Sequence, residues 1–138
     1  MGYKALVVDD YDFMRRTLIR MFRGHPVVTE LLEASDGREA LSVVEANSDL
    51  ALIVTDVDMP VMNGPAMLRE MLGMYATTYY ALPSVIMGSG VPDNRTKYAG
   101  VLTACQGTFL DKPYGVKELL ALVDQALVKY EARRAEKK

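Results

Sequence analysis

Five short apolar segments, each followed by a stretch with helical spacing, constrain the fold of this chain more than any other feature. The apolar segments are residues 5–8, 27–34, 50–55, 84–87 and 108–110. Residues 5–8 and 50–54 are continuous runs of Val, Leu, Ile and Ala, which is the pattern of strands buried on both faces of a parallel sheet. The regular alternation of strand and helix predicts an α/β fold with helices on both faces of the sheet.

The stretches between the strands differ in how strongly they predict a helix. The last one, from Val116 to Leu127, has regular apolar spacing and predicts a well-formed helix. Residues 95–105 predict a poor helix because Gly100 and several β-branched residues interrupt the stretch. The final ten residues hold five basic and two acidic side chains, so we expect a solvated and frayed helix end there.

Polar side chains follow four of the five predicted strands. They are Asp9 and Asp10 after the first strand, Asp56 after the third, Ser89 after the fourth and Lys112 after the fifth. Parallel strands of such a fold bring their carboxyl ends to one edge, where ligands bind. Three neighbouring carboxylates repel one another unless a cation relieves them, and Mg²⁺ suits a partly hydrated carboxylate site. Lys112 and Ser89 would add a positive charge and a hydroxyl donor for a phosphoryl oxygen.

Four motifs carry a resemblance to a known family. They are Val7-Val8-Asp9-Asp10, Asp56-Val57-Asp58-Met59-Pro60 with Met62-Asn63-Gly64, Ile86-Met87-Gly88-Ser89, and Asp111-Lys112-Pro113. In this order and spacing the chain resembles the receiver domain of bacterial two-component response regulators. We expect either a stand-alone regulator of the single-domain type or a receiver from a longer chain. The resemblance implies a doubly wound, flavodoxin-like sheet of five parallel strands in the order 2-1-3-4-5, whereas the alternation alone predicts only the class. We expect a receiver domain over residues 1–130 and a charged tail over residues 131–138.

The resemblance implies a phosphoacceptor and a metal site. Asp56 would accept a phosphoryl group from a sensor histidine kinase or a histidine phosphotransfer protein. Asp10 and Asp56 would bind Mg²⁺ directly, Asp9 would hold the ion through water, and the backbone carbonyl of Asp58 would be a further ligand. The chain would thus catalyse its own phosphorylation and dephosphorylation without being a turnover enzyme in the usual sense.

Further roles follow from the same resemblance. Ser89 would be the hydroxyl switch residue, and Phe109, three positions before Lys112, would be the aromatic switch residue. Lys112 and the backbone amide of Gly90 would bind the phosphoryl group. Glycines flank Ser89 at positions where a large apolar residue and an alanine are usual in the family. Because glycine frees the backbone, we expect a looser loop at Gly88 and Gly90 than in a typical receiver.

The predicted function is a phosphorylation-dependent signalling switch that relays its state through protein–protein contacts. One alternative is a receiver-like interaction domain that is not phosphorylated. A second is a phosphatase of the haloacid dehalogenase type, because Asp56-Val57-Asp58 matches the Asp-x-Asp core of that family. In those phosphatases the first aspartate lies on the earliest strand and the acidic pair comes late, which is the reverse of the order here.

Composition narrows the partners and the compartment. A formal net charge of −2 lacks the basic excess of a nucleic-acid module, so no direct nucleic-acid partner is expected. Cys105 is the one cysteine, which excludes an internal disulfide and favours the reducing cytoplasm. No apolar run approaches the roughly 18 residues needed to span a bilayer, so no membrane contact is expected. The expected partners are the kinase or phosphotransfer protein, a downstream protein target and, as a further option, a second copy in a phosphorylation-linked homodimer.

Overall fold

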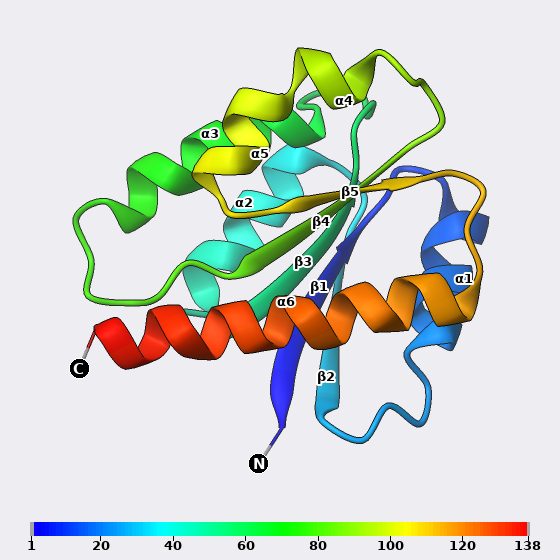
Figure 1. Cartoon of the computed structure of the whole chain (residues 1–138). Helices are drawn as coiled ribbons and strands as arrows, with labels where there is room; N and C mark the ends of the chain where they lie inside the picture. The colour runs from blue at the N-terminus through cyan, green and yellow to red at the C-terminus, as the bar shows by residue number, and fades with distance from the viewer. Residues whose placement is uncertain (1, 138) are drawn as a thin grey trace.

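The sheet of the computed structural model, which describes residues 2–137, has five strands that are all parallel. Their bounds are β1 Tyr3–Val8, β2 Val28–Ala34, β3 Leu50–Asp56, β4 Ser84–Ser89 and β5 Thr108–Asp111. The strand order is β2-β1-β3-β4-β5, which confirms the predicted order (Figure 1). Met1 and Lys138, the outermost residues of the predicted domain and tail, lie outside the described residues.

Six helices flank the sheet within the described residues. Their bounds are α1 Asp12–Met21, α2 Gly37–Ala46, α3 Gly64–Tyr75, α4 Asn94–Lys97, α5 Ala99–Ala104 and α6 Val116–Glu136. Helices α2, α3 and α5 cover one face of the sheet and α1 and α6 cover the other (Figure 1). Each face has its own apolar core, which confirms the prediction of helices on both faces.

The buried strands explain why the apolar segments are continuous rather than alternating. In the central strands β1 and β3, Ala5 to Val8 and Leu50 to Ile53 have no exposed surface. Side chains of these strands enter both of the separate cores, so both faces of the sheet need apolar residues. Within residues 2–137, no helix combines the length and the apolar character that crossing a membrane requires.

The weak helical stretch predicted over residues 95–105 is broken in the structure. It forms two short helices, α4 with four residues and α5 with six, which meet at Tyr98. The expected weakness is therefore confirmed, although one helix was expected. Gly100 and the β-branched residues lower the helix propensity of the segment, so packing rather than propensity decides where it turns.

The end of the chain is more ordered than its charge suggests. Helix α6 continues through the predicted tail to Glu136, and Arg133 is only 9% exposed. Its guanidinium donates to the Leu82 carbonyl at 3.1 Å, to Gln106 Oε1 at 3.1 Å and to Ser84 Oγ at 2.6 Å. The expectation of a solvated, frayed end was wrong at Arg133, because its guanidinium finds three acceptors, of which Ser84 is buried, Leu82 half-buried and Gln106 exposed. The division into domain and tail stays a prediction.

Candidate functional site

Three carboxylates converge where β1 and β3 end. Asp9 and Asp10 directly follow β1, and Asp56 is the last residue of β3. One carboxylate oxygen from each lies within 4.8 Å of those of the other two. Asp9 is buried, Asp56 is half-buried and Asp10 is exposed. The sequence prediction that these three side chains meet at one edge of the sheet is confirmed.

The electrostatics of Asp9 reflect this crowding. Burial raises the pKa of the Asp9 carboxyl above its usual range, and the neighbouring charges of Asp56 and Asp10 raise it further. The backbone amide of Tyr11, which donates to Asp9 Oδ1 at 2.9 Å, opposes the rise, as does the charge of Lys112. The balance disfavours three ionised carboxylates side by side, so the cluster gains from a bound cation.

Lys112 supplies one positive charge to the cluster. Its Nζ donates to Asp56 Oδ1 at 2.9 Å, and the two side chains are only 25% and 18% exposed. The same Oδ1 accepts from the backbone amide of Val57 at 2.9 Å. Partial burial strengthens this ion pair relative to one on the open surface. The predicted partnership of Lys112 with the carboxylate site is therefore present in the fold.

Close backbone packing fixes the loop after β3. The amide of Gly64 donates to the Val57 carbonyl at 2.8 Å, and a Cβ at Gly64 would overlap the backbone oxygen of Asp56. Only glycine fits such an approach without displacing the backbone. Asn63 caps α3 next to it by accepting from the Ala66 amide at 2.8 Å. The start of α3 is thereby held directly against the carboxylate cluster.

Gly88 belongs to the sheet rather than to the loop. It is buried within β4 and pairs with Asp56 in the ladder, while Gly90 is the first exposed residue beyond the strand. The expectation of a looser loop at Gly88 was wrong, because ladder pairing holds its backbone. A Cβ there would lie 3.2 Å from Lys112 Cε, so the absent side chain leaves room for the lysine. Ser89 ends β4 and is 7% exposed.

The two predicted switch residues contact α4 and the loop before it. Ser89 Oγ accepts from Asn94 Nδ2 at 3.0 Å and from the Val91 amide at 3.1 Å, and it donates to the Val91 carbonyl at 3.1 Å. Phe109 is half-buried, and the Arg95 guanidinium lies 5.5 Å from the centre of its ring. Both residues lie where the sequence prediction placed them, and both are held by their neighbours.

Residues 5–124 match the family of response regulator receiver domains. The chain belongs to this family. Receiver domains are phosphorylation-dependent signalling switches of two-component systems, so the predicted function is confirmed at this level. The comparisons give no support to the haloacid dehalogenase alternative.

Known proteins similar to this receiver domain include enzymes and a domain of a hybrid histidine kinase. The protein-glutamate methylesterase/protein-glutamine glutaminase of Alkalilimnicola ehrlichii is 32% identical over 116 residues, covering 83% of this chain and 28% of that protein. The receiver domain from the hybrid histidine kinase CckA is 33% identical, with a TM-score of 0.70 and coverage of 90% of this chain and 98% of that one.

The fold itself recurs at lower identity. The signal receiver domain of an HD domain-containing protein from Pseudomonas fluorescens Pf-5 has a TM-score of 0.80 at 24% identity, covering 97% of this chain and 93% of that one. This chain spans about a third of the length of the first curated relatives it matches. The similarity to those relatives therefore concerns one part of each protein.

Two further residues lie near the carboxylate cluster, and the role predicted for the backbone carbonyl of Asp58 stays a prediction. The side chain of Asp58 is exposed, and within residues 2–137 its carboxylate is not among those that converge. A residue that the sequence motifs did not point to is Tyr114, two residues after Lys112. Burial, followed by the charges of Asp9 and Asp56, raises the pKa of Tyr114 to about 12. The phenol of Tyr114 therefore lies close enough to the cluster for its pKa to respond to the charges there. Its position beside the Lys112 motif is the sequence feature that could have pointed to it.

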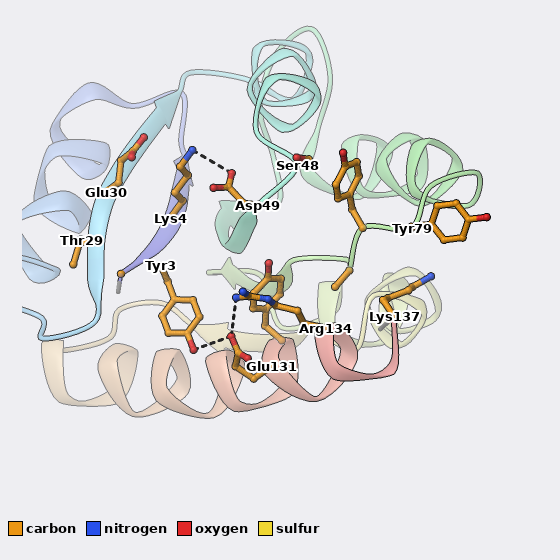
Figure 2. Close-up of a pocket in the computed structure, with 14 residues that line it drawn as sticks. Tyr3, Lys4, Thr29, Glu30, Ser48, Asp49, Tyr79, Glu131, Arg134 and Lys137 are labelled. Atoms are coloured by element: carbon orange, nitrogen blue, oxygen red, sulfur yellow. Dashed lines mark hydrogen bonds and ion pairs between the residues drawn. The ribbon is translucent and has the colours of Figure 1, made fainter.

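A separate pocket lies at the opposite edge of the receiver sheet (Figure 2). It has a volume of about 700 Å³ and is lined by the starts of β1 and β2 and the end of α6. Lys4 pairs with Asp49 at 3.1 Å, and Glu131 accepts from the Tyr3 hydroxyl at 2.9 Å and from Arg134 at 3.2 Å. None of the candidate site residues lines it, so it plays no part in the carboxylate chemistry.

Proposed function

We propose that Asp56 is the phosphoacceptor of this receiver domain. The observation that carries the proposal is the 2.9 Å contact of Lys112 Nζ with Asp56, the one carboxylate of the cluster that also ends a central strand. Lys112 and the Val57 amide both bond to Oδ1, so Oδ2 is free of those two donors and would be favoured as the oxygen that attacks phosphorus. With a phosphohistidine donor, the new bond joins an Asp56 oxygen to phosphorus while the bond from phosphorus to the histidine nitrogen breaks.

The cluster also fits a divalent cation, and we assign Mg²⁺ to it. Three carboxylates within 4.8 Å of one another, one of them buried, are hard oxygen donors of the kind that Mg²⁺ prefers. Asp10 and Asp56 would bind the ion directly, Asp9 through water, and Asp58 through its backbone carbonyl. A bound ion would neutralise charge on the phosphoryl oxygens during transfer.

Three further groups would hold the phosphoryl group once it is attached. The Lys112 ammonium already lies at Asp56, so it needs only a small movement to reach a phosphoryl oxygen. The amide of Gly90 directly follows Ser89, the last residue of β4. Charge-assisted hydrogen bonds of this kind are about twice as strong as neutral ones. They would therefore favour the conformation in which all three donors face Asp56.

The proposed partners follow from the family and its relatives. The donor is a sensor histidine kinase or a histidine phosphotransfer protein, and a similar solved structure is the receiver domain of a hybrid histidine kinase. The phosphorylated state would be relayed to a downstream protein in the cytoplasm, by protein contacts or through a homodimer.

Labelling by acetyl phosphate with Mg²⁺ tests the proposal. We expect intact-protein mass spectrometry to show one phosphoryl group per chain, which is lost over minutes after the donor is removed. A generic phosphate ester should not be turned over. Absence of labelling by acetyl phosphate and by phosphorylated kinases would favour the receiver-like interaction domain that is not phosphorylated, whereas sustained turnover of the ester would favour a phosphatase.

The proposed metal ligands predict a second measurable effect. The Asp10→Ala variant should bind Mg²⁺ about tenfold more weakly than the parent, because the site loses one of its few direct ligands. Titration followed by amide resonances gives the affinity, and Mg²⁺ should raise the thermal midpoint of the parent more than that of the variant. Asp49→Ala is the matched control, since its carboxylate lies at the opposite edge of the sheet. Equal affinities for parent and Asp10→Ala would remove Asp10 from the ligand set.

A further inference from the structure

Two adjacent residues of α4 contact the two switch residues. The Nδ2 of Asn94 donates to Ser89 Oγ at 3.0 Å, and both side chains are 7% exposed. The guanidinium of Arg95 lies 5.5 Å from the centre of the Phe109 ring and pairs with Asp111 at 2.9 Å. One turn of helix thus holds the hydroxyl that would bind the phosphoryl group and the aromatic ring that would respond to it.

The hydroxyl of Ser89 has no free hydrogen-bonding position in this arrangement. A serine hydroxyl has one proton to donate and two lone pairs to accept with. The proton goes to the Val91 carbonyl, and the lone pairs accept from the Val91 amide and from Asn94 Nδ2. Donation to a phosphoryl oxygen therefore requires the proton to leave the Val91 carbonyl, and any turn of Oγ toward Asp56 moves it relative to Asn94 Nδ2.

The burial of Asn94 makes this turn costly. Within residues 2–137, Ser89 Oγ is the hydrogen-bond acceptor that the structure gives Asn94 Nδ2. If Ser89 turns toward Asp56, a buried amide donor loses its partner, which costs more than a hydrogen bond at the surface. The backbone amide of Asn94 donates to the Val91 carbonyl at 3.1 Å, so the helix start and the loop hold the side chain in place.

Arg95, on the solvent side of Phe109, opposes inward movement of this second switch residue. In the ladder between β4 and β5, Met87 pairs with Phe109 and Ser89 pairs with Asp111. Because Arg95 spans Phe109 and Asp111, it covers the stretch of β5 that lies beside Ser89. Inward rotation of the Phe109 ring would give up its contact with the guanidinium.

We propose that Asn94 and Arg95 form a clasp that holds Ser89 and Phe109 in their resting positions. The clasp thereby sets the fraction of molecules that adopt the active conformation. They are positioning residues, and the inference rests on the proposed phosphorylation of Asp56. The phosphoryl group must compete with the Val91 carbonyl for the Ser89 proton, and Asn94 holds the oxygen that carries this proton. Weakening the clasp therefore raises the apparent affinity for a phosphoryl group or its mimic.

Binding of beryllofluoride with Mg²⁺, followed by amide chemical shifts, tests the clasp. Asn94→Leu keeps the side-chain volume without the donor and should bind the mimic about fivefold more tightly than the parent, the change expected from one net hydrogen bond. In a Ser89→Ala background the same Asn94→Leu change should have no effect, because the competition is gone. A general structural role of Asn94 would persist in that background and would overturn the proposal.

Arg95→Met provides a second variant. The Arg95 side chain is 53% exposed, so its loss should leave the fold intact. It should tighten mimic binding about twofold to fivefold, whereas Lys97→Met, which removes a cation above Tyr98 on the same helix, should not. Parent-like affinity in both Asn94→Leu and Arg95→Met would refute the clasp while leaving the proposed function in place. Failure of the parent itself to bind the mimic would overturn the proposed function and the clasp with it.

Discussion

The Asp56→Asn variant is expected to take up no phosphoryl group, whereas the parent takes up one. The substitution keeps the shape of the side chain but replaces a charged nucleophilic oxygen with a neutral amide, so the attack on phosphorus is lost. Acetyl phosphate and a phosphorylated histidine kinase should give the same result, because both donors transfer to the same oxygen. Intact-protein mass spectrometry on the two proteins, side by side with Mg²⁺ present, measures the difference directly.

Asp58→Asn is the matched control for this experiment. Its carboxylate is exposed and stands outside the converging cluster, so the variant should still be labelled once. The rate of loss of the phosphoryl group can change in this control without affecting the assignment. Full labelling of Asp56→Asn would move the phosphoacceptor to another carboxylate, with Asp9 and Asp10 the first to be examined.

Replacing Arg133 with methionine is expected to lower the free energy of unfolding by about 3 kcal/mol. The change leaves the Leu82 carbonyl, Gln106 Oε1 and Ser84 Oγ without the donor that each of them now has. Burial lowers the pKa of Arg133, so part of the gain from its hydrogen bonds already offsets the cost of burying the charge. The loss should therefore be smaller than three independent charged hydrogen bonds would predict. Urea titration gives the midpoint and its slope.

Arg134→Met is the control for the buried arginine. Its side chain is 45% exposed and pairs with Glu131 one helical turn earlier, at 3.2 Å. An exposed pair of this kind contributes about 0.3–0.5 kcal/mol, so this variant should unfold close to the parent midpoint. If the two variants lost equal stability, the contacts of Arg133 would add nothing beyond a surface charge.

Local sequence patterns were enough to predict the class of this fold but not its strand order. Continuous apolar runs such as Leu50 to Val54 mark strands buried on both faces, and helical spacing marks the segments between them. The position of β1 between β2 and β3 depends on contacts between residues far apart in the sequence, which periodicity does not record. The order therefore came from the family motifs.

Part of the candidate site could likewise be predicted from the sequence, and part could not. Asp9, Asp10 and Asp56 could be predicted to meet because parallel strands end at one edge, and the structure brings them together. The contact of Asn94 with Ser89 could not be predicted, because it depends on how a four-residue turn folds back on itself. The anchoring of Arg133 depends on three acceptors that are distant in sequence, and its charge alone predicted a solvated side chain.

The side-chain volume at position 88 affects where the positive charge of Lys112 lies in the site. The backbone of Gly88 pairs with Asp56, and the methyl group of an alanine there would lie 3.2 Å from Lys112 Cε. At that distance the flexible end of the lysine must shift by a few tenths of an ångström, so the volume of residue 88 limits where Lys112 can lie. An uncharged substitution at position 88 thus acts on the charged partner of Asp56 without altering either member of that ion pair.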